Sequence, residues 1–326
     1  MNKKQDWNLK NLVLEKIKEQ GGWVNAHSHL DRAYSINPQS LELGNEHLHK
    51  KWTLVDGLKK SSTIKQIYDR MAFALERQLE QGVTVLASFI DVDEVVKDKA
   101  MKAAQKLKEN YQKDLKLVFI NQALKGVLNP QARFWFEEAL GFVDIIGGLP
   151  GKDAGQEAEH LDVLFALAKK HKKMVHVHVD QLNSPKEKET ELLIKKTQEY
   201  ALGGRVVAVH AVSLAAQPVK YRQKIYQEMQ KNQLMVIVCP TAWIDSRRSE
   251  ELAPIHNAIA PVEELLEAKI PVGLGTDNIA DIYKPFSDGE MWTELRFLLE
   301  TCHFYDIKEL VNIATINGRK ALGLIT

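Results

Sequence analysis

Two histidines lie one residue apart near the start of the chain, in the stretch WVNAHSHLD that begins at Trp23. Side chains of a β-strand alternate between two faces, so His27 and His29 would project to the same side, with Asp31 following them. Paired imidazoles at the end of a strand are typical metal ligands. A single pair of this kind can also arise by chance, so the chemistry depends on what else the chain places beside it.

Similar polar residues end several other short apolar runs. His178 and Asp180 lie in MVHVHVDQL, His210 lies in RVVAVHAVSL, and Asp277 lies in PVGLGTDNI. If the ends of these runs meet, their side chains surround one point. Imidazole nitrogens with a carboxylate suit zinc or iron(II), and a coordination position left open can hold a water. The pattern therefore predicts a site for one divalent transition metal.

The elements that would position these residues are eight β-branched runs separated by amphipathic stretches. From the second run on, they start about 27 to 37 residues apart, which is room for a strand, a helix and two loops. Helices are predicted over 156–172 and 186–202. The runs begin at Trp23, Gly82, Lys116, Val143, Met174, Arg205, Leu234 and Pro271. Eight such units predict an α/β fold, a (β/α)8 barrel of the triosephosphate isomerase type, whose strand ends form one ring at the top.

A doubly wound open sheet is the alternative fold. It is disfavoured because WVNAHSHLDRA contains no glycine-rich phosphate turn after the first strand. We expect residues 1–326 to form a single barrel domain. The long polar interval over 32–62 follows the first strand, on the face where active sites are built, and has weak periodicity. We therefore expect it to be an active-site lid.

The composition excludes several kinds of partner. Lysine and arginine number 44 against 43 aspartate and glutamate, so no excess charge points to nucleic acid or to an anionic membrane. No apolar segment is long enough for a signal peptide or a membrane span. With only Cys239 and Cys302, a disulfide framework is not expected. The default is a cytoplasmic protein with a small-molecule partner, and a homo-oligomer stays open.

These motifs carry a family resemblance. HSHLD, HVDQLN, VHAVSL and GTDN resemble the metal-dependent amidohydrolase superfamily, and more narrowly its cytosine deaminase and N-isopropylammelide hydrolase branch, from about Trp23 to Leu324. The resemblance implies that His210 contacts the metal-bound water or the substrate carbonyl. It also implies an accessory β-sandwich in many relatives, which we expect to be missing from this chain. The metal ligands implied are His27, His29, His178 and Asp277.

The expected chemistry is hydrolysis of a C–N bond in a small nitrogen heterocycle. A carboxylate such as Asp277 can accept the proton of a metal-activated water, and His210 can polarise an oxyanion or move a proton to the leaving amine. The resembled deaminases have a glutamate three residues after the strand-five histidine, where this chain has Gln181. Glutamine cannot transfer that proton. Two interpretations follow: a hydrolase that relies on Asp277 and His210, or a metal-binding barrel with lost or weak catalysis.

Substrate contacts follow from the same resemblance. Gln122 resembles a glutamine that hydrogen-bonds the heterocycle, and Tyr283 falls where the deaminases place an aromatic residue on the ring. Arg32 replaces a lysine of the ammelide hydrolases, and could bind an oxyanion or pair with Asp31. Trp243, at the end of the seventh run, is a packing residue and a candidate pocket wall.

A two-metal hydrolase is the alternative enzyme class. Such a site needs a bridging carboxylated lysine or a glutamate at the end of the fourth strand. The only candidate in VDIIGGLPGK is Lys152, which lies too far past the strand. One metal per chain is therefore expected.

Overall fold

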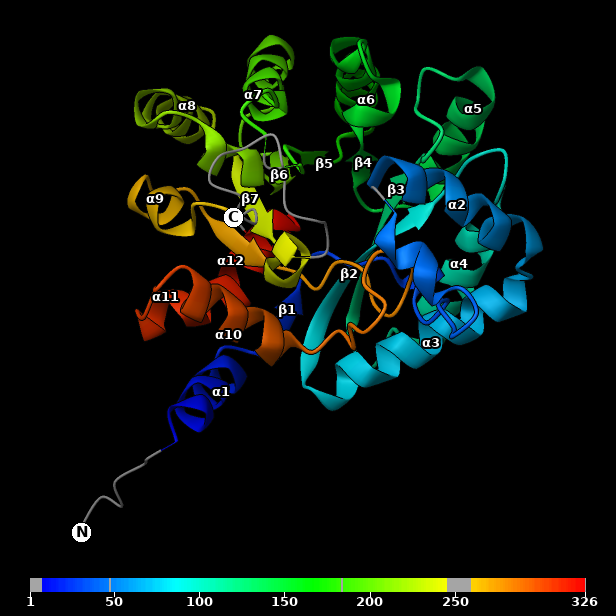
Figure 1. The fold of residues 1–326 in the computed structure, drawn as a ribbon, viewed down its shortest axis with the longest axis horizontal. Helices are drawn as coiled ribbons and strands as arrows, with labels where there is room; N and C mark the ends of the chain where they lie inside the picture. Colours follow the sequence, from blue (N-terminus) through cyan, green and yellow to red (C-terminus); the bar gives the residue numbers. More distant parts are fainter. Residues whose placement is uncertain (1–7, 47, 183, 245–258, 326) are drawn as a thin grey trace.

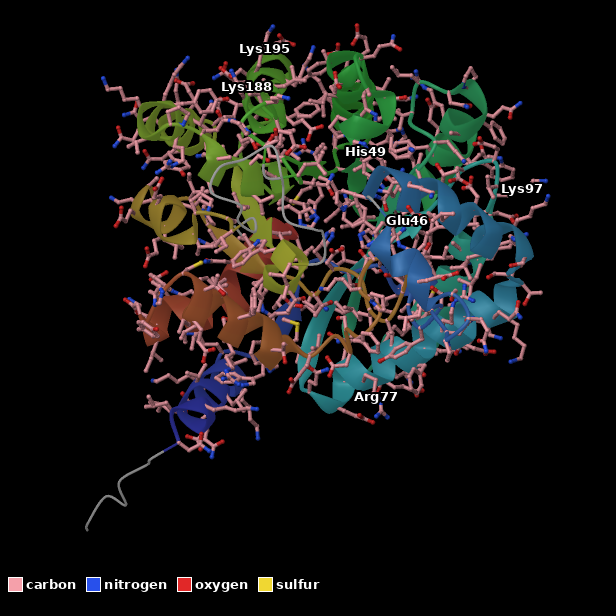
Figure 2. All side chains as sticks on the ribbon, viewed as in Figure 1. Glu46, His49, Arg77, Lys97, Lys188 and Lys195 are labelled. Atoms are coloured by element: carbon pink, nitrogen blue, oxygen red, sulfur yellow. The ribbon has the colours of Figure 1, made fainter. Side chains whose placement is uncertain are left out.

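The computed structural model describes residues 8–46, 48–182, 184–244 and 259–325. Within them, strands and helices alternate along the chain, and Figure 1 shows the helices ringed around the strands. The charged Arg77 of α3 and Lys195 of α7 lie on the outside of this ring (Figure 2). The chain has the expected (β/α)8 barrel fold.

In the described part of the chain, eight parallel strands form two sheets in sequence order. One sheet has the order β1-β2-β3 and the other β4-β5-β6-β7-β8. Each strand coincides with one of the eight predicted runs. The strands are β1 (Trp23–Asn25), β2 (Val83–Asp91), β3 (Lys116–Gln122), β4 (Ile146–Gly148), β5 (Val175–Val179), β6 (Val206–His210), β7 (Met235–Val238) and β8 (Val272–Leu274).

Single bridges join the two sheets at both seams. Ile120 of β3 pairs with Ile145, next to β4, and Ser28 pairs with Asp277 in the segments that follow β1 and β8. The backbone N–H of Ala26 also donates to the carbonyl of Leu274 at 2.9 Å. The seam between β1 and β8 therefore places the segment of His27 and His29 directly beside the segment of Asp277.

Alternation along the strands divides the apolar residues into two layers. Val85, Ala87 and Phe89 belong to a cluster inside the strand ring, whereas Leu86 and Ile90 pack against the helices. Period-two side-chain geometry explains this split. Strands that are apolar on both faces are typical of a parallel sheet covered by helices, and they give the barrel a solid interior below the polar residues.

The helices follow the predicted periodicity with shifted ends. The predicted helix over 186–202 begins three residues later, at Glu189, whose backbone N–H donates to the carboxylate of Asp180 at 2.8 Å. The helices are α1 (Leu9–Glu19), α2 (Leu48–Ser61), α3 (Ile64–Glu80), α4 (Lys99–Tyr111), α5 (Pro130–Glu138), α6 (Glu157–His171), α7 (Glu189–Tyr200), α8 (Val219–Lys231), α9 (Val262–Glu267), α10 (Met291–Thr301), α11 (Ile307–Ala314) and α12 (Ile316–Ala321).

The lower end of the barrel is tied to the C-terminal helix. Nε2 of His176 lies 2.8 Å from the carbonyl oxygen of Ala321 in α12, and Asn317 donates to the carbonyl of Val272 at 3.0 Å. Burial lowers the pKa of His176 to about 3, so this imidazole is neutral. His176 is thus an interior hydrogen-bonding residue, in a layer of the barrel below His178.

The long interval after β1 contains a helix that the sequence did not predict. The inner face of α2 carries Lys51, Trp52, Val55 and Lys59, and Trp52 and Val55 pack in one cluster with Leu124, Leu149, Ile282 and Tyr283. These four partners follow β3, β4 and β8, so α2 lies against the C-terminal ends of the strands (Figure 1). No helix in the described residues is long and apolar enough to cross a membrane.

Candidate metal centre

The seam between β1 and β8 brings His27, His29 and Asp277 together. The backbone N–H groups of Thr276 and Asp277 both donate to the carbonyl of His27 at 3.0 Å. Gly275 makes this approach feasible, because a Cβ there would lie 2.6 Å from the Cβ of His27. Close backbone approach is a common reason for glycine at such a site. All three candidate ligands are buried.

His178 and His210 come from neighbouring strands, because β5 pairs with β6 in parallel. The ring centre of His27 lies 4.9 Å from that of His178 and 5.5 Å from that of His210. Oδ1 of Asp277 lies 3.5 Å from Nε2 of His27 and 3.3 Å from Nε2 of His29. The described residues thus contain two overlapping groups with metal-ligating distances: His27, His178 and His210, and His27, His29 and Asp277.

The hydrogen bonding of this cluster fits a cation. Both ring nitrogens of His27 and Nδ1 of His29 are buried without a hydrogen-bond partner among the described residues. Nδ1 of His178 lies 3.1 Å from the carbonyl oxygen of Gly148, so this nitrogen carries the proton and Nε2 is left to bind. A second hydrogen bond of this kind usually orients a metal-ligating histidine. Buried polar atoms without partners are costly, and a bound cation would satisfy them.

The protonation states also fit. Burial lowers the pKa of His29 to about 3 and that of His210 to about 4, and it holds the pKa of His178 well below its ordinary value. Burial alone would raise the pKa of Asp277, but the ring nitrogens of His27 and His29 hold it well below the usual range. Neutral imidazoles around an ionised carboxylate are the forms that bind a transition metal.

Asp180, which the sequence groups with the other polar residues at the strand ends, does not belong to this cluster. It has a positive φ of 54° and its carboxylate turns to the start of α7. There it accepts from the backbone of Glu189 at 2.8 Å and from Thr190, while the Glu189 carboxylate accepts from the backbone of Asp180 at 2.8 Å. The pair is a reciprocal helix cap. Gln181 follows it directly and is half-buried.

Three of the predicted substrate residues carry polar atoms without partners. Gln122 ends β3, Trp243 lies in the short 3-10 helix η6 (Pro240–Ile244) after β7, and Tyr283 follows β8. Oε1 of Gln122, Nε1 of Trp243 and the Tyr283 hydroxyl are all buried and have no hydrogen-bond partner in the described part of the chain. An acceptor, an N–H donor and a hydroxyl are thus available to a ligand.

Arg32 is instead held by two carboxylates. Its Nη1 lies 3.1 Å from both oxygens of Asp91, and its Nε lies 3.5 Å from Oδ2 of Asp281. The sequence left an oxyanion and Asp31 as alternative partners of Arg32. Asp31 instead accepts a hydrogen bond from the backbone of Asp91 at 2.9 Å. Arg32 therefore crosses from the end of β1 to the ends of β2 and β8.

A buried ion-pair network next to Arg32 was missed in the sequence. Nζ of Lys59 in α2 lies 2.5 Å from Asp93 and 3.3 Å from Asp91. The only signal was the pair of aspartates in SFIDVDE, at the end of the second run. Their partner lies more than 30 residues earlier, in a segment without clear periodicity. The network fastens α2 to the strand end beside the histidine cluster.

Comparisons with known proteins identify the family of the chain. The model of the amidohydrolase family matches residues 22–325. The chain belongs to the amidohydrolase family. It is 44% identical over 262 residues to a Haemophilus influenzae protein of unassigned function, covering 79% of this chain and 95% of that one. Membership of this family, with its deaminase and amidohydrolase relatives, makes the chain a hydrolase of C–N bonds.

More distant members of the family are named for their reactions. The chain is 25% identical over 301 residues to N-isopropylammelide isopropyl amidohydrolase from a Pseudomonas species, covering 87% of this chain and 70% of the other. Its fold matches 5-methylcytosine deaminase from Klebsiella pneumoniae with a TM-score of 0.86 at 22% identity, over 93% of this chain and 75% of that structure. The branch suggested by the sequence motifs is therefore confirmed.

Proposed function

We propose that the chain hydrolyses a C–N bond of a small nitrogen heterocycle, with one divalent transition metal, zinc or iron, supplying an activated water. The observation that carries this proposal is the set of buried, unpartnered imidazole nitrogens around the Asp277 carboxylate. The residues that would hold the metal are His27, His29, His178 and Asp277.

The chain's own residues would divide the proton transfers. Asp277 is ionised and can accept the proton of the attacking water. His210 is a neutral imidazole beside His27 and His178, so it can donate to the developing oxyanion and move a proton to the leaving amine. Gln181 can only donate and accept hydrogen bonds, so it would orient the substrate.

The polar atoms left without partners support a heterocyclic substrate. The Gln122 acceptor, the Trp243 N–H and the Tyr283 hydroxyl come from the ends of β3, β7 and β8. The ring nitrogens and oxo groups of a heterocycle can form hydrogen bonds with these three protein groups. A substrate without such groups would leave the protein groups buried and unpaired, and would therefore bind less well. The relatives described above are named for N-isopropylammelide and for 5-methylcytosine, which are rings of this kind.

The segment 32–62 would act as a lid on this reaction. Its helix α2 packs against residues that follow β3, β4 and β8, and Lys59 ties it to Asp91 and Asp93. A segment that covers the mouth of the barrel excludes water and completes the site once substrate is bound. The lid belongs to the same barrel domain, which we propose extends over residues 1–326.

The test is a release assay with protein of known metal content. Ammonia and amine release would be followed across aminopyrimidines, alkylaminotriazines and pterins, with Asp277→Asn as the matched variant that keeps size and removes the charge. We expect turnover of at least one ring class by the parent, reduced by about 10²-fold or more in Asp277→Asn. Equal rates for both proteins would overturn the role of Asp277, and no turnover of any ring would overturn the proposed function.

A further inference from the structure

His160 is a buried histidine of α6 that lies outside the histidine cluster. Its Nε2 lies 3.2 Å from the backbone nitrogen of Leu149, and its Nδ1 lies 2.6 Å from Oδ2 of Asp153, at the end of the 3-10 helix η4 (Pro150–Asp153). A backbone N–H can only donate a hydrogen bond, so Nε2 of His160 is the acceptor and its Nδ1 carries the proton. The imidazole therefore accepts from the peptide group before Leu149 and donates to Asp153.

That peptide group connects His160 to the candidate ligand His178. The C=O of Gly148 and the N–H of Leu149 belong to one planar unit and point in opposite directions from it. The N–H donates to His160, while the C=O accepts from Nδ1 of His178 at 3.1 Å. A continuous chain of hydrogen bonds thus runs from His178 through the peptide group and His160 to Asp153. We call it the outer hydrogen-bond chain.

The packing of α6 on β4 makes this chain possible. Leu164 lies one helical turn after His160, and a Cβ on Gly148 would overlap with its Cδ1. Because Gly148 has no side chain, α6 can approach the peptide group closely enough for His160 to bind it. Asp153 is held from the other side, since its Oδ2 accepts from the backbone N–H of Val127 at 2.9 Å. Separate elements therefore fix the position of each member of the chain.

The outer hydrogen-bond chain ends in a negative charge. Burial alone would raise the pKa of the Asp153 carboxyl, but its hydrogen bonds with His160 and with the backbone of Val127 and Leu128 hold it below the ordinary value. The shared protons all point from His178 toward this carboxylate, and hydrogen bonds aligned in this way polarise one another. The hydrogen bond of Nδ1 of His178 is thereby strengthened, and its Nε2 becomes a better metal ligand.

His178 is the candidate ligand on which such a chain can act. Nδ1 of His29 and both ring nitrogens of His27 have no hydrogen-bond partner among the described residues, whereas Nδ1 of His178 has the Gly148 carbonyl. Loss of the group that orients a metal-bound histidine typically lowers metal affinity about 10–100-fold. The metal affinity of this site should therefore respond to the residues behind His178.

We propose that His160 is a positioning residue of the metal centre, which acts through the peptide group between Gly148 and Leu149 to orient His178 and to raise its affinity for a divalent metal ion. This inference rests on the proposed function, because it takes His178 to be a metal ligand. It adds a residue that touches neither the metal nor the substrate. Its measure is metal affinity, which is determined without any turnover.

Two substitutions separate the two hydrogen bonds of His160. In His160→Asn, the side-chain amide can take the place of Nδ1 and donate to Asp153, but the acceptor for Leu149 is lost. In His160→Gln, the side-chain carbonyl can take the place of Nε2 and accept from Leu149, but the bond to Asp153 is lost. We expect His160→Asn to weaken zinc binding about tenfold, at the lower end of the range for groups behind a ligand, and His160→Gln to weaken it less.

Zinc affinity is measured by competition with a chromogenic chelator, and folding by circular dichroism. His176→Gln is the matched control, because His176 is also buried in the barrel but binds the carbonyl of Ala321 instead, and we expect it to keep the parental zinc affinity. NMR of the zinc-loaded, 15N-histidine-labelled protein gives a second readout. The Nδ1 proton of His178 should move upfield in His160→Asn, because its hydrogen bond is weaker, and should stay in place in His176→Gln.

Parental zinc affinity or an unmoved Nδ1 proton in a folded His160→Asn would overturn the proposal. An equal loss of affinity in His176→Gln, or a larger loss in His160→Gln than in His160→Asn, would also overturn it. If His160→Asn does not fold, His160→Gln decides: a weakened zinc affinity upholds the proposal and a parental one overturns it.

The release assay keeps this inference apart from the proposed function. The expected losses in a parent that binds zinc but releases no amine uphold the role of His160 and overturn the proposed function. A parent that hydrolyses a ring, with a His160→Asn variant of unchanged zinc affinity, gives the reverse result. A parent that binds no zinc overturns this inference whatever the release assay shows.

Discussion

Replacing Lys59 by methionine should destabilise the protein strongly, although this residue lies outside the histidine cluster. Its side chain is 5% exposed, and its ammonium lies between two buried carboxylates, 2.5 Å from Asp93 and 3.3 Å from Asp91. Removing one partner of a buried ion pair leaves an uncompensated charge and costs about 3–5 kcal/mol. With roughly 2 °C of Tm per kcal/mol for a large domain, Tm should fall by about 6–10 °C.

The pH dependence gives this prediction a second test. Burial alone would raise the pKa of Asp91, but Lys59 and Arg32 hold it below its ordinary value. A carboxyl with a lowered pKa in the folded state stabilises the protein above its unfolded pKa, and this contribution is lost as the pH falls. Lys59→Met forfeits part of that contribution at pH 7. The difference in Tm between parent and variant should therefore shrink as the pH is lowered toward 4.

The control is the next residue on the same helix. Lys60 is exposed, so Lys60→Met should change stability by no more than about 0.5 kcal/mol. Differential scanning calorimetry of the three metal-matched proteins at pH 7 and pH 4 measures both effects. Equal Tm values for Lys59→Met and Lys60→Met at pH 7, or a Lys59→Met deficit that grows as the pH falls, would refute the reasoning.

Two further predictions concern the reaction. Gln181→Glu should lower native turnover, because it adds negative charge next to Asp180 in the loop that precedes α7. The measurement is kcat/KM at equal metal occupancy. A new deaminase activity in the variant, with an inactive parent, would contradict the prediction. Trp243→Phe should weaken ligand binding about fivefold, which corresponds to the loss of one hydrogen bond. It should leave Tm unchanged, because Nε1 of Trp243 has no hydrogen-bond partner among the described residues. An unchanged Kd, measured by calorimetry, would show that the indole only packs.

The sequence predicted the barrel and the candidate ligands because both depend on local patterns. His178 and His210 lie within strands, where period two fixes the direction of each side chain. His27, His29 and Asp277 lie just past β1 and β8, close enough to the strand ends for the same reasoning to hold. Eight similar units then place those ends on one face.

What the sequence could not predict depends on contacts between distant segments. The role of Asp180 follows from a left-handed turn that directs its carboxylate to α7, which strand periodicity cannot indicate. Helix α2 was missed because Lys51 and Lys59 occupy its buried face and interrupt the apolar pattern. Lys59 is paired there with Asp91 and Asp93, and Lys51 lies over the ring of Tyr283. These partners lie at or after the ends of β2 and β8, far from α2 in the sequence.

The most direct test of the metal centre compares two histidines of one strand. His178 and His176 are both buried in β5, but His178 lies in the cluster and His176 binds the carbonyl of Ala321 below it. Metal content by elemental analysis, after purification without chelator, should be about one per chain in the parent and in His176→Gln, and reduced at least about tenfold in His178→Gln. Parental metal content in a folded His178→Gln, or an equal loss in both variants, would contradict the assignment.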